Sequence, residues 1–255
     1  MLLAVDVGNT QIAIGLFQDA ELVGHWRIAT RRDQTEDELA AIFKGLFDLS
    51  DIRQKEVTDI AIASVVPSST AALTAFSRKY FAVDPFVVEP GVETGISVKY
   101  DNPDEVGADR IVNAVAGFER YGGPLIIVDF GTATTFDAIS EAGEYLGGAI
   151  APGILVSAEA LFSRAARLHR IDLIAPERAI GRDTASSIQA GVLFGTAGMV
   201  DSLVGRIVAE LGEPREVIAT GGLAELVSAQ CGSLSAVEPY LTLEGLKLVY
   251  RRNSK

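Results

Sequence analysis

The sequence predicts an α/β protein with two similar lobes, each a mixed sheet flanked by helices, and a cleft between them. Two stretches carry this prediction, "LLAVDVGNTQIAIGLF" at 2–17 and "LIIVDFGTATTFDAI" at 125–139. Each runs from an apolar strand into an Asp, an x-Gly-polar turn and a second strand. In both halves strands then give way to amphipathic helices. The repeated order favours a duplication; the alternative is a chance likeness of two hairpins.

The first lobe is expected to open with a three-stranded meander through residue 30, with Gly and Asp in its turns. A helix is expected over 35–49, because Leu39 and Phe43 recur at helical spacing and Thr35 with Glu38 forms a capping box. The remaining elements expected in this lobe are a buried strand over 57–67 ended by its proline, a helix over 69–81 and a strand over 85–90.

A helix is expected to join the lobes. Asn102 suits its N-cap, Pro103 its first position, and Gly122 its end. We therefore place the domain boundary inside this helix, with lobes over 1–117 and 118–255.

The second lobe is expected to continue with helices over 155–168 and 187–211 and a strand–turn–helix unit over 218–227. In that unit Gly221 and Gly222 would let a flat ring such as adenine lie against the backbone, or would simply make a tight turn. The segment "LGGAIAPG" at 146–153 has similar alternatives, a ligand-binding turn or a plain glycine-rich loop.

Composition excludes several classes of function. Asp and Glu number 34 against 22 Lys and Arg, so the formal net charge is −12, which argues against general nucleic-acid binding. One cysteine, Cys231, allows no intramolecular disulfide and no cysteine zinc cluster, and the two histidines are too few for most metal sites. We see no signal peptide and no apolar run of about 20 residues, and expect a cytoplasmic protein without a membrane partner.

The two Asp-x-Gly turns have the chemistry of a phosphate site. A glycine turn between strands exposes backbone N–H groups that an anion can use, and Asn9 and Thr10 add donors. Asp6 and Asp129 would repel phosphate directly, but each can hold a cation or a water that bridges to it. The alternative is an Asx turn, in which the Asp binds only its own backbone. The chain has no Walker A motif and no G-x-G-x-x-G after a strand.

The "GADR" segment suggests proton transfer. Asp109 could accept a proton from a substrate hydroxyl while Arg110 balances negative charge. The alternative is a solvated surface pair. A local basic cluster of Arg164, Arg167, His169 and Arg170 is most simply a solvated face.

Taken together, these motifs resemble those of type III pantothenate kinases. "DVGNT", "DNPDEVGADRIVNA", "DFGTATTFD", "GGAIAPG" and "IGRDTASSIQAG" follow in that family's order and spacing over nearly the whole chain. The family belongs to the superfamily of acetate kinase, sugar kinases, heat-shock ATPases and actin, so the resemblance implies two ribonuclease-H-like lobes. One departure is His169 and Arg170, where the family often has a proline beside an aliphatic residue.

The resemblance implies ATP-dependent phosphorylation of pantothenate to 4'-phosphopantothenate, the first step of coenzyme A biosynthesis, by a homodimer. It implies Asp109 as proton acceptor, Asp129 as ligand of a monovalent cation (potassium or ammonium), and magnesium carried by ATP. The implied ATP-binding residues are Asp6, Val7, Gly8, Asn9, Thr10, Gln11, Ile12, Ala13 and Thr132. The implied pantothenate-binding residues are Tyr100, Gly107, Ala108, Asp109, Arg110 and Thr184.

Two other functions stay open from the residues. One is a transcriptional accessory factor on the same scaffold, which we would expect to lack Asp109 or to carry a basic surface. The other is a kinase of the same fold acting on a sugar or acetate, against which "GADR" and Tyr100 argue only through the resemblance.

Overall fold

The computed structural model describes residues 1–164 and 170–254, which form two compact units. Unit 1 comprises Met1–Ile96, Asp101–Ala116 and the chain from Leu241 onward. Unit 2 comprises Ser97–Tyr100 and Gly117–Tyr240. Two residues of the basic cluster, Arg167 and His169, lie outside the described residues.

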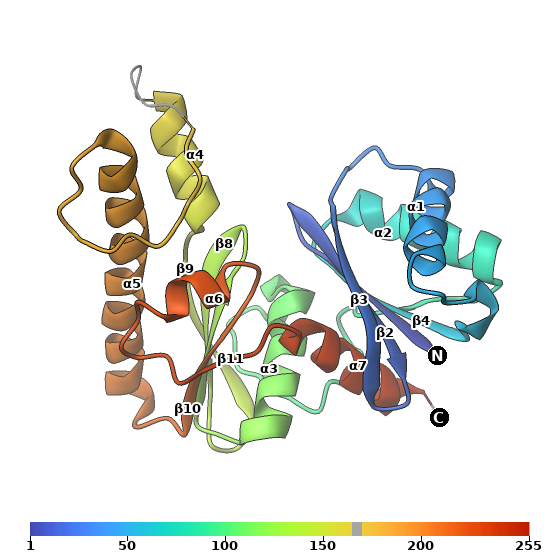
Figure 1. Ribbon diagram of the computed structural model, residues 1–255. Helices are drawn as coiled ribbons and strands as arrows, with labels where there is room; N and C mark the ends of the chain where they lie inside the picture. Colours follow the sequence, from blue (N-terminus) through green and yellow to red (C-terminus); the bar gives the residue numbers. More distant parts are fainter. Residues whose placement is uncertain (165–169, 255) are drawn as a thin grey trace. The chain divides into compact units, whose positions relative to one another are not determined.

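Unit 1 is a five-stranded mixed sheet in the order β3-β2-β1-β4-β5. Helices α1 and α2 cover one face of it and α7 covers the other (Figure 1). The strands are β1 (Leu2–Val7), β2 (Gln11–Gln18), β3 (Glu21–Ala29), β4 (Asp59–Ser64) and β5 (Phe86–Val87). The helices are α1 (Glu36–Asp48), α2 (Pro67–Phe76), α7 (Leu241–Asn253), the short η1 (Gln54–Glu56) and η3 (Pro103–Glu105), and the π-helical turn η2 (Ser77–Phe81).

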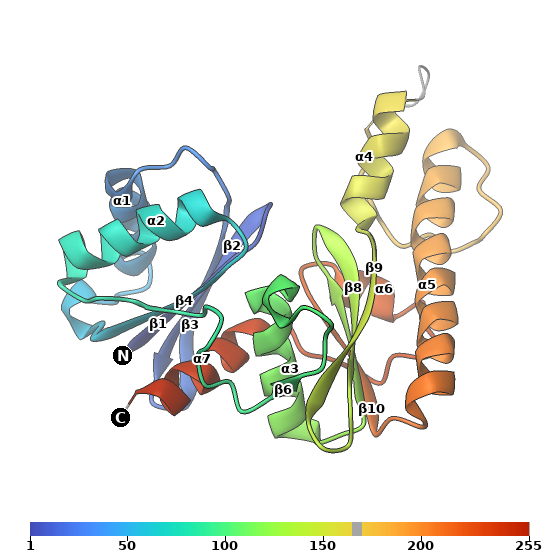
Figure 2. The same ribbon diagram turned by 180° about the vertical axis from the view of Figure 1, so that it is seen from behind.

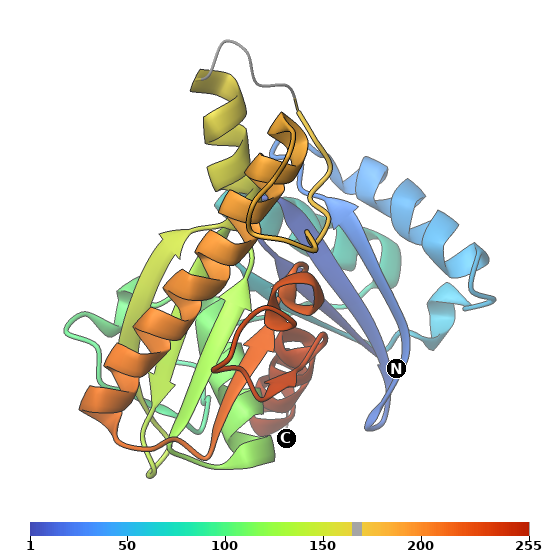
Figure 3. The same cartoon turned by 60° about the vertical axis from the view of Figure 1, so that its left-hand side comes forward.

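Unit 2 is a six-stranded mixed sheet in the order β11-β10-β7-β8-β9-β6. The long helix α5 crosses one face of it (Figure 3). The strands are β6 (Ser97–Val98), β7 (Leu125–Phe130), β8 (Ala133–Ile139), β9 (Glu144–Pro152), β10 (Glu216–Thr220) and β11 (Ala236–Val237). The helices are α4 (Ile154–Arg164), α5 (Thr184–Leu211) and α6 (Ala224–Ser228), and α3 (Ala108–Tyr121) begins in unit 1 and ends in unit 2.

The predicted α/β duplication is confirmed by the two sheets. Strands β3-β2-β1-β4-β5 of unit 1 correspond in order to β9-β8-β7-β10-β11 of unit 2. In each sheet the first three strands pair antiparallel, and the last two add in parallel. The short β6 is an extra strand beside β9 in unit 2. The expected cleft between the lobes stays a prediction.

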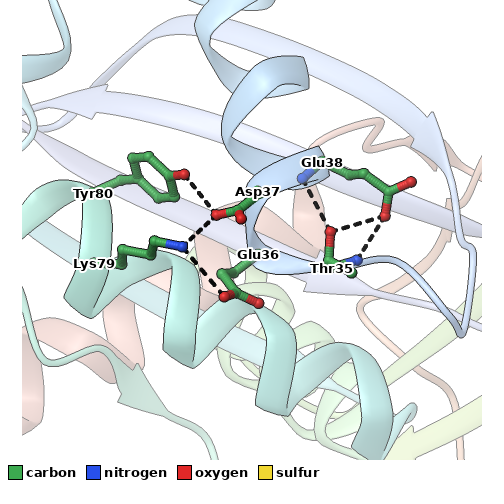
Figure 4. Close-up of polar contacts among 6 residues, drawn as sticks. All are labelled: Thr35, Glu36, Asp37, Glu38, Lys79 and Tyr80. Carbon is green, nitrogen blue, oxygen red and sulfur yellow. Dashed lines mark hydrogen bonds and ion pairs between the residues drawn. The ribbon is translucent and has the colours of Figure 1, made fainter.

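The start of α1 follows the sequence expectation closely. Thr35 Oγ1 accepts a hydrogen bond from the backbone of Glu38 at 3.3 Å, and Glu38 Oε2 accepts from the backbone of Thr35 at 2.8 Å (Figure 4). Asp37 in the same turn accepts bonds from Lys79 Nζ at 2.5 Å and from the Tyr80 hydroxyl at 2.6 Å. These exposed contacts tie α1 to the π-helical turn η2, although exposed ion pairs add little stability.

Three expected elements differ from the structure. The linking helix begins at Ala108 rather than after Asn102, because Pro103–Glu105 forms a separate short turn and Asn102 Nδ2 bonds Glu105 Oε1 at 2.9 Å instead of capping a helix. Pro67 begins α2 rather than only ending β4, and the expected helix over 69–81 becomes π-helical from Ser77. Most of the glycine-rich segment 146–153 is strand β9, not a loop.

The C-terminal helix α7 differs from the expected lobe boundaries, since it belongs to unit 1 rather than to the unit of 118–240. Its apolar face packs on β1, β2 and β4, with Leu243 and Leu246 buried. Two polar contacts join it to the end of the sheet where β1 and β4 begin. Lys247 Nζ donates to the carbonyl of Ala20 at 3.0 Å, and the Tyr250 hydroxyl donates to Asp59 at 2.6 Å.

Among the described residues, α5 is the one helix long and apolar enough, by length and composition, to cross a membrane. Its best window has a mean hydropathy of 1.5, and 28% of that window is buried. By that measure, the expectation that the chain has no apolar run of about 20 residues is wrong. Core helices of water-soluble proteins pass the same test, so this helix by itself is weak evidence for a membrane span.

Candidate active site

The first Asp-x-Gly turn lies at one edge of the unit 1 sheet. Asp6 sits in β1 between Ala13 of β2 and Ala63 of β4, so its position is fixed by strands on both sides. The turn is closed by a hydrogen bond from Gly8 N to Gln11 O at 3.0 Å, and the Thr30 hydroxyl donates to Gly8 O at 2.7 Å. Residues 9–11 are exposed. Solvent, or a ligand, can therefore reach this turn.

The "GADR" segment reaches the same edge of unit 1. The backbone of Val65, just after β4, donates to Val7 O at 3.1 Å. A Cβ placed on Gly107 would lie 3.5 Å from Val65 Cγ1 and would collide with Asp109 Oδ1. Gly107 is thus packed between the end of β4 and the Asp109 carboxylate. The expected proton acceptor therefore lies at the edge where β1 and β4 end.

Asp109 occupies the first turn of α3, and its Oδ1 accepts a hydrogen bond from Arg110 N at 2.8 Å. Burial raises the pKa of the Asp109 carboxyl, and the backbone N–H and the charge of Arg110 partly oppose that rise. Arg110 is only 8% exposed. The alternative of a solvated surface pair is therefore wrong, and the carboxylate has the desolvated setting typical of a catalytic base.

The second Asp-x-Gly turn lies at one edge of the unit 2 sheet. Asp129 in β7 pairs with Thr135 of β8 on one side and with Thr220 of β10 on the other. Gly131 N donates to Ala133 O at 3.0 Å, which makes this turn one residue shorter than its counterpart in unit 1. The two turns are thus similar in chain path but not identical.

Two further backbone segments meet this second turn. Gly153 N donates to Thr132 O at 3.1 Å, directly after β9. Gly221 has a φ of +97°, and a Cβ there would lie 2.5 Å from Asp129 Oδ1. Only a glycine leaves room beside the carboxylate in that conformation. Asp129, Thr132 and the glycine turn at Gly221 therefore lie at the same edge of the unit 2 sheet. This glycine turn is the one for which the sequence suggested contact with an adenine ring.

The donor set near Asp129 suits a cation with oxygen ligands. Residues paired across antiparallel strands share a face, so the Thr135 hydroxyl lies on the face of the Asp129 carboxylate. Thr135 Oγ1 is buried and has no hydrogen-bond partner within the structure. Within the described residues, no cluster of three His, Cys, Asp or Glu could hold a metal by itself. Carboxylate and hydroxyl oxygens suit a hard cation better than a transition metal, which prefers nitrogen or sulfur ligands.

The other expected pantothenate contacts lie in unit 2. Tyr100 follows β6, and Thr184 is the first residue of α5 after Asp183, whose side chain caps the helix through Ser186 N at 2.8 Å. Thr184 lines a cavity of about 1000 Å³ bordered by Leu161, Gly191 and Gly195. Thr184 thus lines a space large enough for a small molecule.

The sequence predictions missed two residues of these edges, Thr135 and Gly153. Thr135 is two residues past the second strand's start, and the hairpin register pairs it with Asp129, so a full register assignment would have found it. Gly153 could have been found as the last glycine of the segment "LGGAIAPG", for which a ligand-binding turn was one of the alternatives. The one cysteine, Cys231, is half-buried, and burial raises the pKa of its thiol to about 11.

Comparisons with known proteins identify the family. The model of the family "Type III pantothenate kinase" matches residues 2–206. A type III pantothenate kinase of Moorella thermoacetica is 52% identical over 100% of this chain and 100% of its own length. One of Citrifermentans bemidjiense is 51% identical over 99% of this chain and 100% of its own length.

Solved structures with the same fold are more distant in sequence. An activator of the 2-hydroxyisocaproyl-CoA dehydratase from Clostridium difficile, with bound ADPNP, has a TM-score of 0.60 and 12% identity, covering 100% of this chain and 98% of its own. A ROK hexokinase from Thermus thermophilus has a TM-score of 0.53 and 13% identity, covering 98% of both chains. These neighbours support the two-lobed ribonuclease-H-like fold. By sequence across its whole length, the chain belongs to the type III pantothenate kinase family.

Proposed function

We propose that Asp109 is the proton acceptor with which the chain phosphorylates the primary hydroxyl of pantothenate. The single observation that carries this role is the buried setting of the carboxylate, which raises its pKa at the edge where β1 and β4 end. A base with a raised pKa is a stronger acceptor for a hydroxyl proton as the γ-phosphoryl group transfers. No covalent nucleophile is needed, since such transfer depends on positioning and charge stabilisation.

We propose that the ATP phosphates are held by Asp6–Ala13 and that Thr132 is a further nucleotide contact. The exposed backbone of residues 9–11 and the closed Gly8 turn support this role, because N–H groups at such turns bind anions. Gly221 and Gly222 would accept the adenine ring. Magnesium bound by ATP supplies charge neutralisation at the phosphates, as the kinase family implies.

We propose that Asp129 and the Thr135 hydroxyl hold a monovalent cation, potassium or ammonium. The buried hydroxyl beside the carboxylate supports this assignment, because an unpaired buried oxygen costs free energy unless a ligand satisfies it. The cation would hold Asp129 in place and reduce its repulsion of phosphate.

The pantothenate site is proposed to use Tyr100, Gly107–Arg110 and Thr184. Arg110 would balance negative charge on the bound substrate, since the residue is only 8% exposed and directly follows the proposed base in the first turn of α3. The cavity beside Thr184 supports a role in holding the rest of the substrate.

We further propose a cytoplasmic homodimer that buries the outer face of α4 and α5. In α4, Leu155 is 54% exposed and Val156 is 45% exposed, which is costly for large apolar side chains unless a partner covers them.

The experiment that tests the function measures ADP release with pantothenate, with and without potassium, beside panels of other alcohols, sugars and acetate. We expect turnover that requires pantothenate and rises with potassium. Turnover that requires a sugar or acetate instead would overturn the assignment of substrate. A dependence on promoter DNA would revive the alternative of a transcriptional accessory factor.

A further inference from the structure

Strand β9 carries a bulge next to Tyr100, one of the proposed pantothenate contacts. Ala138 of β8 pairs with Gly147, but Ile139 pairs with Tyr145, so Leu146 is an extra residue on β9. Figure 2 shows the long β8–β9 ribbon that contains it. Gly147 has a φ of +116°, in the region that side chains rarely adopt. Bulges of this kind re-aim side chains and are frequent beside active sites.

The ring of Tyr100 rests against this bulge. The backbone of Lys99 donates to Tyr145 O at 2.8 Å, which fixes the main chain just before Tyr100. A Cβ on Gly147 would lie 3.2 Å from Tyr100 Cε2 and 3.3 Å from Cδ2. The absence of a side chain at Gly147 therefore lets the Tyr100 ring lie over the strand's backbone.

Tyr145 is the second residue that contacts the Tyr100 ring, and together with Gly147 it forms what we call the seat of Tyr100. The two ring centroids are 6.4 Å apart, at an interplanar angle of 55°. Tyr145 is fully buried, and its hydroxyl donates to Asp137 Oδ1 at 2.7 Å. Asp137 is also fully buried. A hydrogen bond to a buried carboxyl group is strong and directional, so it holds the Tyr145 ring in one orientation.

We propose that the β9 bulge, through Gly147 and Tyr145, is a positioning element that holds the ring of Tyr100 for pantothenate binding. The inference rests on the proposed role of Tyr100 as a pantothenate contact. Gly147 and Tyr145 are positioning residues, since they act through Tyr100. A methyl group at Gly147 is closer to the ring than ordinary van der Waals contact, so it displaces the ring by a few tenths of an ångström.

The test is a double-mutant cycle of Gly147→Ala and Tyr100→Ala, with steady-state kinetics for both substrates. We expect Gly147→Ala to raise the KM for pantothenate about tenfold and to leave the KM for ATP within about twofold. In the Tyr100→Ala background the same substitution should add little, because the ring that it displaces is gone. Tyr145→Phe keeps the aromatic ring but removes the hydroxyl that bonds Asp137, and should raise the KM for pantothenate about threefold.

Gly212→Ala is the matched control, because Gly212 also has a positive φ, +88°, but nothing lies near its missing side chain. It should lower stability and leave both KM values unchanged. If Tyr100→Ala raises the KM for pantothenate and neither Gly147→Ala nor Tyr145→Phe does, the positioning role is wrong and the role of Tyr100 stands. If Tyr100→Ala leaves that KM unchanged while the wild type still needs pantothenate, the role of Tyr100 fails and the function stands. If Gly147→Ala does not fold, Tyr145→Phe decides the proposal.

Discussion

Substituting Gly107 by alanine tests the placement of the proposed base while Asp109 itself stays unchanged. The new methyl group would collide with Asp109 Oδ1 while lying 3.5 Å from Val65 Cγ1. Real Cβ contacts essentially never fall below 3.0 Å, so the carboxylate must move by about 0.6–1 Å. Oδ1 is also the acceptor of the 2.8 Å bond from Arg110 N, which such a movement would stretch or break. We therefore expect the base to lose its alignment with the substrate hydroxyl.

The magnitude follows from the sensitivity of phosphoryl transfer to geometry. A misplacement of about 1 Å can cost about 10²-fold in rate, so we expect kcat/KM for pantothenate to fall by about that factor. Steady-state kinetics give the rate, and thermal unfolding checks that the variant is folded. Gly45→Ala is the control, because nothing lies near its missing side chain inside α1 and alanine there should add about 0.5–1 kcal/mol of stability. A Gly107→Ala enzyme within about threefold of wild type would refute the reasoning.

Three further outcomes are expected. Because burial raises the pKa of Asp109 and the Arg110 charge opposes the rise, Arg110→Gln should move the acid limb of kcat/KM for pantothenate to higher pH; an unmoved limb would contradict this. Gly221→Ala should raise the KM for ATP at least about tenfold without a comparable change for pantothenate, since its Cβ would lie 2.5 Å from Asp129 Oδ1 and 2.7 Å from the Phe130 backbone; equal effects on both would contradict a role of this turn in ATP binding. Leu155→Asp should convert a dimer to a monomer by light scattering; an unchanged dimer would place the interface elsewhere.

Features with local signals could be predicted from the sequence. The Thr35 capping box follows from two residues three apart, and the structure has both of its hydrogen bonds. The duplicated hairpins follow from a repeated pattern, and β1–β2 and β7–β8 share its strand order. Asp6 and Asp129 therefore fall at corresponding points of two sheets, as the pattern indicates.

Features that depend on tertiary packing could not be predicted in this way. Asn102 and Pro103 carry an N-terminal helix signal, but the chain uses it for one short turn before α3. The segment around Gly148 has the composition of a loop, yet it is part of β9, where glycine is needed because a side chain at 148 would collide with the carbonyl of Phe136. No local pattern shows that α7 completes unit 1, since its buried face is defined by β1 and β4.

The same limit applies to the site. Proximity of Thr135 to Asp129 depends on strand register, and the seat of Tyr100 depends on a bulge that shifts Tyr145 relative to Gly147. Glycine-rich composition alone could not distinguish this seat from a flexible loop.

The most direct test of the central claim compares Asp109→Asn with wild type for pantothenate-dependent ADP release and for stability at pH 7. Because the folded-state pKa of Asp109 is raised, its ionised form costs stability once the pH exceeds the unfolded value, so the neutral amide should stabilise the fold. We expect turnover to fall by about 10²–10⁴-fold while the unfolding temperature stays the same or rises. Turnover near wild type in a folded Asp109→Asn enzyme would contradict the assignment of Asp109 as the base.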